Sequence, residues 1–212
     1  KKTKGIVLDL RNNPGGLLTQ AINATNLFVD KGVIVSQKGR DKKNKEEHKA
    51  NKSTTLTKVP MVVLVNGGSA SASEIVSGAL QDLKRAVIIG EKTFGKGSVQ
   101  VILPITKDNK EAVKLTIAKY YLPSGRTIQA VGITPDILSF KGKSIMKEDN
   151  AFSIKEADLK KHLLSELDKT KTTKKKKDTK KDDKTILTQK TLDEDNQLQT
   201  AVNILKALIL TK

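Results

Sequence analysis

The stretch Val59-Pro-Met-Val-Val-Leu-Val-Asn-Gly-Gly-Ser-Ala-Ser-Ala-Ser-Glu74 predicts a strand, a turn and the start of a helix in direct succession. Residues 59–65 are almost all apolar and mostly β-branched, which indicates a fully buried strand. Residues 66–70 contain two glycines and an asparagine, which favour a turn. Apolar residues then recur at positions 72, 75, 76, 79, 80 and 83, the spacing of an amphipathic helix.

The flanking sequence continues this alternation of strands and helices. Further short apolar segments predict strands, namely residues 5–10, 33–35, 86–89, 98–103 and 112–121. Helical periodicity covers residues 17–29, and we expect loops over residues 38–52 and 90–97. Strands interleaved with helices predict an α/β fold with a mostly parallel sheet.

The composition changes after Pro135, so we divide the chain into units. Residues 1–137 are expected to form the core, and residues 138–168 a helical extension with its periodic pattern at 153–167. A Lys-rich, disordered linker is expected over 169–190 and a C-terminal helix over 191–212. The chain begins without Met or a leader sequence, so we expect a fragment whose upstream part is missing.

Composition excludes several kinds of site. The sequence has no Cys, which excludes disulfides, zinc-thiolate sites and a Cys nucleophile, and it has only two His. The net charge of +17 is concentrated in Lys-rich runs such as residues 38–52 and 169–184. These runs lack the aromatic side chains on which bases would stack, so they indicate solvated surface and no nucleic-acid partner is expected. The apolar runs are too short to cross a bilayer.

Ser71 is the first candidate for a chemical role. It follows a buried-type strand and a glycine-rich turn at the start of a helix, where free N–H groups and the helix dipole favour an oxyanion. The alternative is structural, because Ser71-Ala-Ser-Glu74 matches the S-x-x-E capping box. Ser69 and Ser73 are rival nucleophiles, and no G-x-S-x-G elbow is present.

A serine nucleophile needs a base, and neither histidine is well placed for that role. His48 lies in the Lys-rich loop and His162 in the helical extension. Lysine can replace histidine where burial lowers the pKa of its amine. Lys96 stands out because two glycines flank it in Thr93-Phe-Gly-Lys-Gly97, where Phe94 is expected to shield the amine from water. An exposed turn lysine is the alternative.

Residues 90–97 also match most of the P-loop pattern G-x-x-x-x-G-K-[ST]. The last position should be Ser or Thr, but it is Gly97. The pattern should also open a helix, whereas residues 98–103 predict a strand. We therefore do not expect nucleotide binding.

Taken together, several motifs resemble the C-terminal processing (tail-specific) peptidases, the S41 family of serine endopeptidases. The motifs stand in the family's order and are Asp9-Leu-Arg-Asn-Asn-Pro-Gly-Gly16, Asn66-Gly-Gly-Ser-Ala-Ser-Ala-Ser-Glu74, Gly90-Glu-Lys-Thr-Phe-Gly-Lys-Gly-Ser-Val-Gln100, Tyr121-Leu-Pro-Ser-Gly-Arg-Thr-Ile128 and Gly132-Ile-Thr-Pro-Asp136. The resemblance covers residues 5–137. It implies a ClpP/crotonase-like α/β core and cleavage of polypeptides near the C-terminus through a Ser/Lys dyad.

The resemblance also implies roles for individual residues. Ser71 is expected to be the nucleophile, Lys96 the general base, and Gln100 the residue that orients Lys96. Glu74 and Arg11 belong to the motifs too, but capping and packing explain them as well as catalysis does.

The oxyanion hole is expected from the backbone N–H groups of Gly16 and Ala72, with Gly15 as the neighbouring alternative to Gly16. No metal or cofactor is implied. The family resemblance implies protein or peptide substrates with accessible C-termini and a place outside the cytoplasm. Membrane association is expected only through the missing N-terminal part, and a homo-oligomer is left open.

The same resemblance leads us to expect weak or no activity of the isolated chain, because the PDZ domain of the family is missing from it. Two other functions remain open at this point. One is a non-catalytic homologue that binds polypeptide chains, and the other is a basic binder of polyanions.

Overall fold

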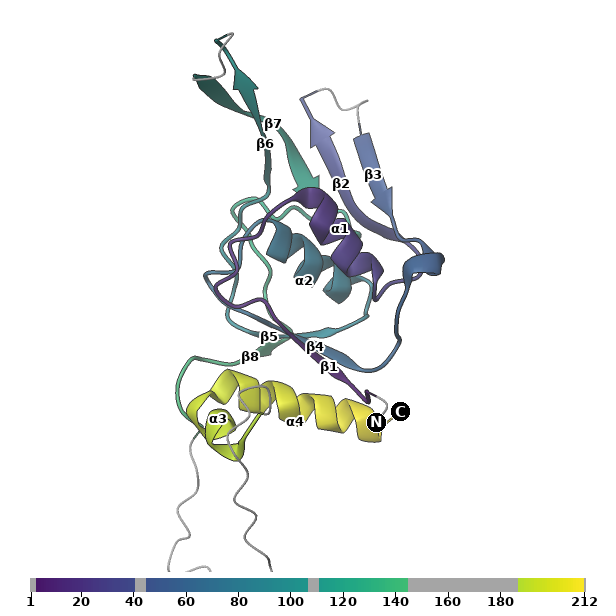
Figure 1. Ribbon diagram of the computed structural model, residues 1–212, viewed down its shortest axis with the longest axis vertical. Coiled ribbons are helices and arrows are strands. Elements are labelled where there is room, and N and C mark those ends of the chain that lie inside the picture. The colour runs from purple at the N-terminus through teal and green to yellow at the C-terminus, as the bar shows by residue number, and fades with distance from the viewer. Residues whose placement is uncertain (1–2, 41–44, 107–110, 145–186, 212) are drawn as a thin grey trace, which may run out of the picture.

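The computed structural model describes residues 3–40, 45–106, 111–144 and 187–211. The helix expected over residues 153–167 and the Lys-rich run 169–184 lie outside these ranges, as does His162. The described ranges form two sheets with helices packed around one of them (Figure 1).

The first sheet is parallel and has the order β1-β4-β5-β8. Its strands are β1 (Ile6–Asp9), β4 (Met61–Val65), β5 (Val87–Gly90) and β8 (Ile137–Leu138). Every residue of β4 is buried, as the apolar run predicts for a central strand covered on both faces. The predicted α/β fold with a parallel sheet is thereby confirmed.

Helices cover both faces of the parallel sheet (Figure 1). On one face lie α1 (Leu18–Asn26) and α2 (Ala72–Asp82), and Met61, Val63 and Val65 of β4 point into the core beneath them. On the other face, α4 (Asn196–Leu210) packs Ala201 against Val62 and Leu64. Successive residues of β4 thus alternate between the two cores, which is the period of two expected for a strand.

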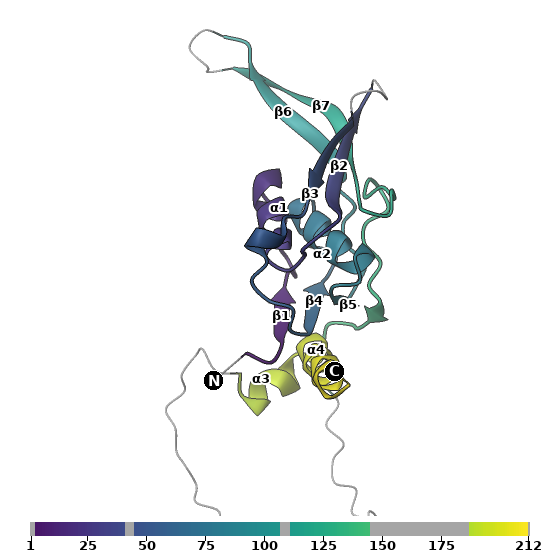
Figure 2. The ribbon, with the colours of Figure 1, turned by 90° about the vertical axis from the view of Figure 1, so that its right-hand side faces the viewer.

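The second sheet is antiparallel, has the order β3-β2-β7-β6, and was not predicted as a separate sheet. Its strands are β2 (Val33–Gly39), β3 (Lys45–Lys49), β6 (Ser98–Pro104) and β7 (Ala112–Tyr121). The hairpin formed by β6 and β7 extends away from the helices (Figure 2).

The loop expected over residues 38–52 is wrong in part. β2 continues to Gly39, β3 pairs with it, and only a short 3₁₀ helix (Lys52–Thr54) follows. β3 is an edge strand whose side chains are almost all exposed. Charged residues are common on edge strands because they discourage pairing with other chains, so the Lys- and Glu-rich sequence of β3 shows no apolar alternation.

The C-terminal region closes with α3 (Gln189–Glu194) and α4, in agreement with the helix predicted near the end of the chain. Among the ranges that are described, no helix is both long enough and apolar enough to cross a membrane.

Candidate active site

Ser71 lies where the chain turns from β4 into α2, and its backbone is strained. It is the N-cap of α2 and has φ of 55°, a value that residues other than glycine rarely adopt. A strained serine between a strand and a helix is the geometry of the nucleophile elbow of hydrolases. The predicted capping box is also present, since the Ser71 N–H donates to Glu74 Oε2 at 2.8 Å. Capping therefore does not argue against a chemical role.

The two rival serines occupy different surroundings. Ser69 is completely buried, and its hydroxyl donates to the Leu10 carbonyl at 2.7 Å and accepts from the Asn66 N–H at 3.0 Å. Ser73 is buried inside α2. Ser71 is only half-buried, so of the three serines it is the one with access to solvent at the helix start.

Glu74 joins the loop of Ser71 to the loop of Lys96. The side chain is completely buried, and its Oε2 accepts the backbone N–H of Ser71 at 2.8 Å and that of Lys96 at 2.9 Å. Its Oε1 accepts the Gly95 N–H at 2.6 Å and the Thr93 hydroxyl at 2.5 Å. A buried carboxylate is stable only when its oxygens are hydrogen-bonded, and these four donors meet that need. One oxygen atom thus places the backbones of Ser71 and Lys96 side by side.

The Lys96 loop is further fixed from its other side. The Thr93 hydroxyl accepts the Ile133 N–H at 2.7 Å, and the Thr93 N–H donates to the Ile133 carbonyl at 3.1 Å. Gly97 packs so closely that a Cβ atom there would lie 2.4 Å from the Gln129 nitrogen. A glycine next to Lys96 is therefore required by the close approach of backbone to backbone.

The side chains expected to act on the Lys96 amine are arranged differently from the prediction. Lys96 itself is half-buried. The ring of Phe94, expected to shield the amine, is instead 69% exposed. Gln100 begins the exposed part of β6, and its side-chain amide donates to the Thr116 hydroxyl at 3.4 Å. A contact between Gln100 and Lys96 therefore stays a prediction.

The backbone N–H groups of Gly16 and Ala72, the expected oxyanion donors, have no hydrogen-bond acceptor within the described part of the chain. The Gly15 N–H, by contrast, donates to Asn13 Oδ1 at 2.9 Å. Gly15 nevertheless sets the geometry, because a Cβ atom on it would lie 2.7 Å from the Ala72 nitrogen. Of the two glycines, Gly16 is therefore the one whose N–H has no acceptor in the described ranges, and its place in an oxyanion hole stays a prediction.

The other candidates from the sequence lie elsewhere. His48 is on β3, where its ring contacts Gln37 at 3.3 Å and Glu46 at 3.4 Å in the antiparallel sheet. The P-loop-like segment after Gly90 leads into strand β6 and not into the helix that a P-loop opens. Within the described ranges, no group of three or more His, Asp or Glu side chains is arranged to hold a metal ion.

Glu74 is the residue whose importance the sequence understated. The S-x-x-E pattern explains its bond to Ser71 and nothing more. Its bonds to Thr93, Gly95 and Lys96 join segments that are far apart in the sequence, and no local pattern reports such contacts.

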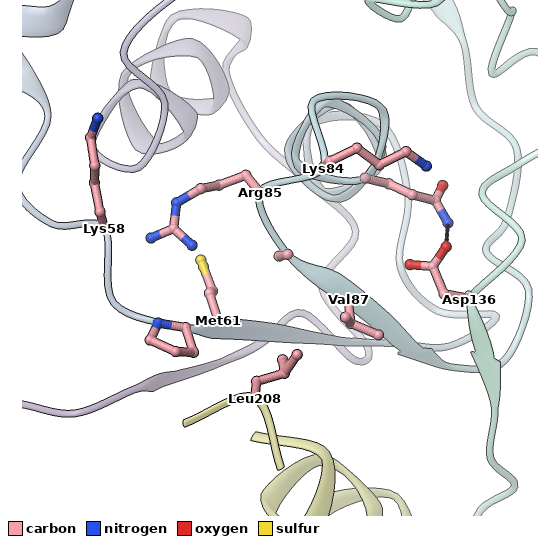
Figure 3. A pocket seen from close by; sticks show the side chains of 10 residues that line it. Lys58, Met61, Lys84, Arg85, Val87, Asp136 and Leu208 are labelled. Carbon is pink, nitrogen blue, oxygen red and sulfur yellow. Dashed lines mark hydrogen bonds between the residues drawn. The ribbon is translucent and has the colours of Figure 1, made fainter. Parts of the chain in front are cut away.

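A cavity of about 450 Å³ lies at the opposite edge of the parallel sheet, where β4 and β5 begin (Figure 3). Arg85 is its most buried charge, and burial lowers the pKa of its guanidinium. Arg85 donates to the carbonyls of Phe28 at 2.8 Å, Thr57 at 3.2 Å and Val59 at 3.0 Å. These bonds tie loops together, so the arginine has a structural explanation.

The chain is similar to known proteins over the region that holds this site. The sequence model described as "Peptidase family S41" matches residues 1–139. The carboxy-terminal-processing protease of Bartonella bacilliformis is 56% identical over 137 residues, which are 65% of this chain and 31% of that protein. The carboxy-terminal processing protease CtpA of Bacillus subtilis is 47% identical over 137 residues, 65% of this chain and 29% of that protein.

A solved structure is also similar to this chain. The photosystem II D1 C-terminal processing protease superposes with a TM-score of 0.58 at 40% identity, covering 65% of this chain and 35% of that one. The chain spans about a third of the length of the curated relatives that it matches.

Proposed function

Because the chain belongs to peptidase family S41, we propose that it carries the catalytic core of a serine endopeptidase that cleaves polypeptides near their C-terminus. One observation above all supports this proposal. A single oxygen of the buried Glu74 carboxylate accepts the backbone N–H groups of both Ser71 and Lys96. The proposed nucleophile and the proposed base are thus held by the same atom.

In the proposed mechanism, Lys96 takes the hydroxyl proton of Ser71 as the serine oxygen attacks the substrate carbonyl, which requires an uncharged amine at that moment. The N–H groups of Gly16 and Ala72 hold the oxyanion of the tetrahedral intermediate. Lys96 then returns the proton to the leaving amine, and an acyl-enzyme remains on Ser71. Water releases the acyl group with Lys96 again acting as the base. Each oxyanion donor contributes about 3 kcal/mol to stabilisation of the transition state.

Gln100 has a proposed role as the residue that orients the Lys96 amine. Its place on β6, just beyond the Lys96 loop, supports this role. Its amide is bonded weakly to Thr116 at 3.4 Å, so it can leave that partner when substrate binds.

The substrate class is part of the proposal. Both curated relatives carry names that describe processing at the carboxyl terminus. We therefore propose protein or peptide substrates with accessible C-termini, processed outside the cytoplasm as the family resemblance suggests.

The proposal is tested with a fluorophosphonate, a small electrophile that requires the nucleophile and the base but no substrate-recognition site. Ser71 Oγ forms the bond to phosphorus, fluoride leaves, and Lys96 takes the proton. We expect one adduct per chain in wild type and none in Ser71→Ala. In Lys96→Ala, the rate of adduct formation should fall by a factor of about 100 or more. Intact-protein mass spectrometry follows the reaction.

Matched controls are Ser124→Ala and Lys92→Ala, each of which removes an exposed side chain of the same type outside the site. Both should react at the wild-type rate. Labelling of Ser71→Ala at that rate would overturn the proposed nucleophile. Binding of a peptide by wild type without any Ser71-dependent labelling would favour a non-catalytic homologue.

A further inference from the structure

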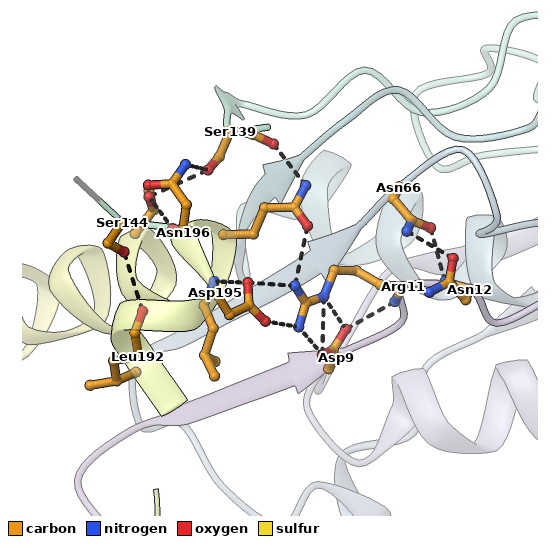
Figure 4. Close-up of polar contacts among 12 residues, drawn as sticks. Asp9, Arg11, Asn12, Asn66, Ser139, Ser144, Leu192, Asp195 and Asn196 are labelled. Carbon is orange, nitrogen blue, oxygen red and sulfur yellow. Dashed lines mark hydrogen bonds and ion pairs between the residues drawn. The ribbon is translucent and has the colours of Figure 1, made fainter. Parts of the chain in front are cut away.

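Arg11 connects the end of β1 to the beginning of α4 (Figure 4). On one side, its guanidinium donates to both carboxylate oxygens of Asp9 at 2.7–3.1 Å. On the other side, it contacts both oxygens of Asp195 at 2.8–2.9 Å and Gln197 Oε1 at 3.2 Å. Paired contacts between a guanidinium and a carboxylate are among the strongest and most directional hydrogen bonds in proteins.

The segment that follows Arg11 carries the proposed oxyanion donor. Asn12 exchanges hydrogen bonds with Asn66, which lies in the turn before Ser71: the Asn12 N–H donates at 2.9 Å and Asn66 Nδ2 returns a bond at 3.0 Å. The Asn13 carbonyl accepts the Ala70 N–H at 3.0 Å. The segment from Arg11 to Gly16 is therefore held by α4 at its beginning and by the Ser71 turn along its length.

The beginning of α4 is itself a fixed point. Asp195 is the N-cap of α4 and accepts the Leu198 N–H at 3.0 Å. Gln197 is only 2% exposed and donates to the Ser139 carbonyl at 2.8 Å, and Ala201 is completely buried against β4. Asp195 thus cannot follow Arg11 if the loop moves. It anchors the loop to the body of the sheet.

This anchor lies outside residues 1–139, the range that matches the peptidase family. The hydrogen bond to Asp9 raises the pKa of Arg11, burial opposes this effect, and the hydrogen bond to Asp195 raises the pKa further. The guanidinium of Arg11 therefore stays charged, and its contact with Asp195 is an ion pair.

We infer that Asp195 is a positioning residue of the proposed peptidase site: by holding Arg11 it fixes the segment 11–16 and, through it, the Gly16 N–H relative to Ser71. The inference rests on the proposed function. Asp195 touches no reacting atom and acts only through Arg11 and the backbone. A displaced Gly16 would leave Ser71 and Lys96 in place and weaken the stabilisation of the oxyanion alone.

The test compares Asp195→Asn with Asp193→Asn. Asparagine is as good an N-cap as aspartate, so Asp195→Asn keeps the cap of α4 and removes only the ion pair with Arg11. Asp193 is the matched control because its carboxylate accepts from Gln189 within α3 and does not contact Arg11. The measured quantity is the maximal rate of fluorophosphonate reaction with Ser71 at saturating probe, well below the unfolding temperature.

We expect this rate to fall about 2- to 30-fold in Asp195→Asn, the range typical of residues that couple to a site without touching it. Asp193→Asn should react at the wild-type rate, and Asp195→Glu should recover most of the loss because it restores the charge. The probe concentration at half-maximal rate should stay unchanged. A purely structural role predicts a lower unfolding temperature with an unchanged maximal rate.

The outcomes separate the two proposals. If wild type reacts at Ser71 and Asp195→Asn reacts equally fast, the positioning role is refuted while the proposed function stands. If wild type shows no Ser71-dependent reaction, the proposed function fails, and the inference falls with it.

Discussion

Glu74 holds the two loops of the candidate site together, since its carboxylate accepts hydrogen bonds from Ser71, Thr93, Gly95 and Lys96. Within the described ranges, none of these four donors has another hydrogen-bond acceptor. The residue therefore combines two roles, completing the N-terminus of α2 and holding the Lys96 loop against it. Loss of its charge should affect stability and reactivity together.

Glu74→Gln replaces one accepting oxygen by a donating NH₂ group that faces backbone N–H groups. We expect a loss of about 2–4 kcal/mol in the free energy of unfolding, because two buried donors lose their partner. Urea unfolding measures the change. The control is Glu91→Gln. In the described part of the chain, the Glu91 carboxylate accepts a hydrogen bond from the Lys141 N–H alone, at 3.2 Å, so this variant should change stability by less than about 0.5 kcal/mol. Equal stability of Glu74→Gln and wild type would contradict the account.

Gly15 and Gly16 are neighbours with opposite requirements. Gly15 has φ of +94°, and a Cβ atom on it would lie 2.6 Å from the Ala70 carbonyl oxygen. A Cβ atom on Gly16, by contrast, would meet no other atom within 4 Å in the described part of the chain. Gly15→Ala should therefore cost more than about 1 kcal/mol of stability and abolish most labelling of Ser71, whereas Gly16→Ala should unfold within about 0.5 kcal/mol of wild type. Urea unfolding measures the stability, and mass spectrometry measures the labelling of Ser71 by the fluorophosphonate. Equal stability and equal labelling of the two variants would refute this contrast between Gly15 and Gly16.

At the scale of elements, the sequence predicts what local patterns encode. The apolar run of β4 and the periodicity of α2 identify both elements because each is buried on the faces its pattern indicates. β3 escapes prediction, although it pairs with the preceding strand β2, because its exposed, charged side chains show no apolar alternation. For the same reason, Ser71 and Lys96 are found from motifs, whereas the contact of Arg11 with Asp195 is not.

The junction between Arg11 and α4 has a defined dependence on pH. Burial raises the pKa of Asp195, but hydrogen bonds from Arg11 and from the Leu198 N–H outweigh this effect and leave the pKa below its usual value. A carboxyl group with a lowered pKa contributes stability above its unfolded value of about 3.9 and loses it as the pH falls through the lower folded value. The junction should therefore persist unchanged from pH 8 to pH 5.

The measurement is the difference in unfolding free energy between wild type and Asp195→Asn as a function of pH. We expect about 1 kcal/mol or less, since Asp195 is partly exposed and water screens the pair. This difference should be constant from pH 8 to pH 5 and shrink below about pH 4. Arg11 and Asp195 line a cavity whose other charged groups are Asp9, Lys141, Lys143 and Glu194. A difference that disappears near neutral pH would point to one of these other groups or to another part of the protein.

At the scale of the whole molecule, the parallel sheet needs a layer on each face. Residues 1–139 supply the sheet with α1 and α2, and α4 from beyond this range covers the other face. The sequence predicted the parallel sheet and a C-terminal helix. It did not predict that the helix packs on the sheet, because an amphipathic pattern does not identify the surface that it covers.

Ala201→Arg tests this arrangement directly. Ala201 is completely buried between α4 and β4, so an arginine there must either lose its hydration or displace the helix. We expect a loss of at least about 3 kcal/mol in thermal or urea unfolding. Asn203→Arg places the same side chain on the exposed side of α4 and should leave stability within about 0.5 kcal/mol of wild type. Similar stability of the two variants would show that α4 does not cover the sheet in solution.

The crystal structure of the chain after reaction with a fluorophosphonate tests the central claim most directly. The account predicts phosphorus bonded to Ser71 Oγ, with its oxygen about 3 Å from the backbone nitrogens of both Gly16 and Ala72. It also predicts the Lys96 amine within hydrogen-bond reach of Ser71 Oγ. An adduct on another residue, or a Lys96 amine directed away from Ser71 in the adduct, would contradict the Ser/Lys site.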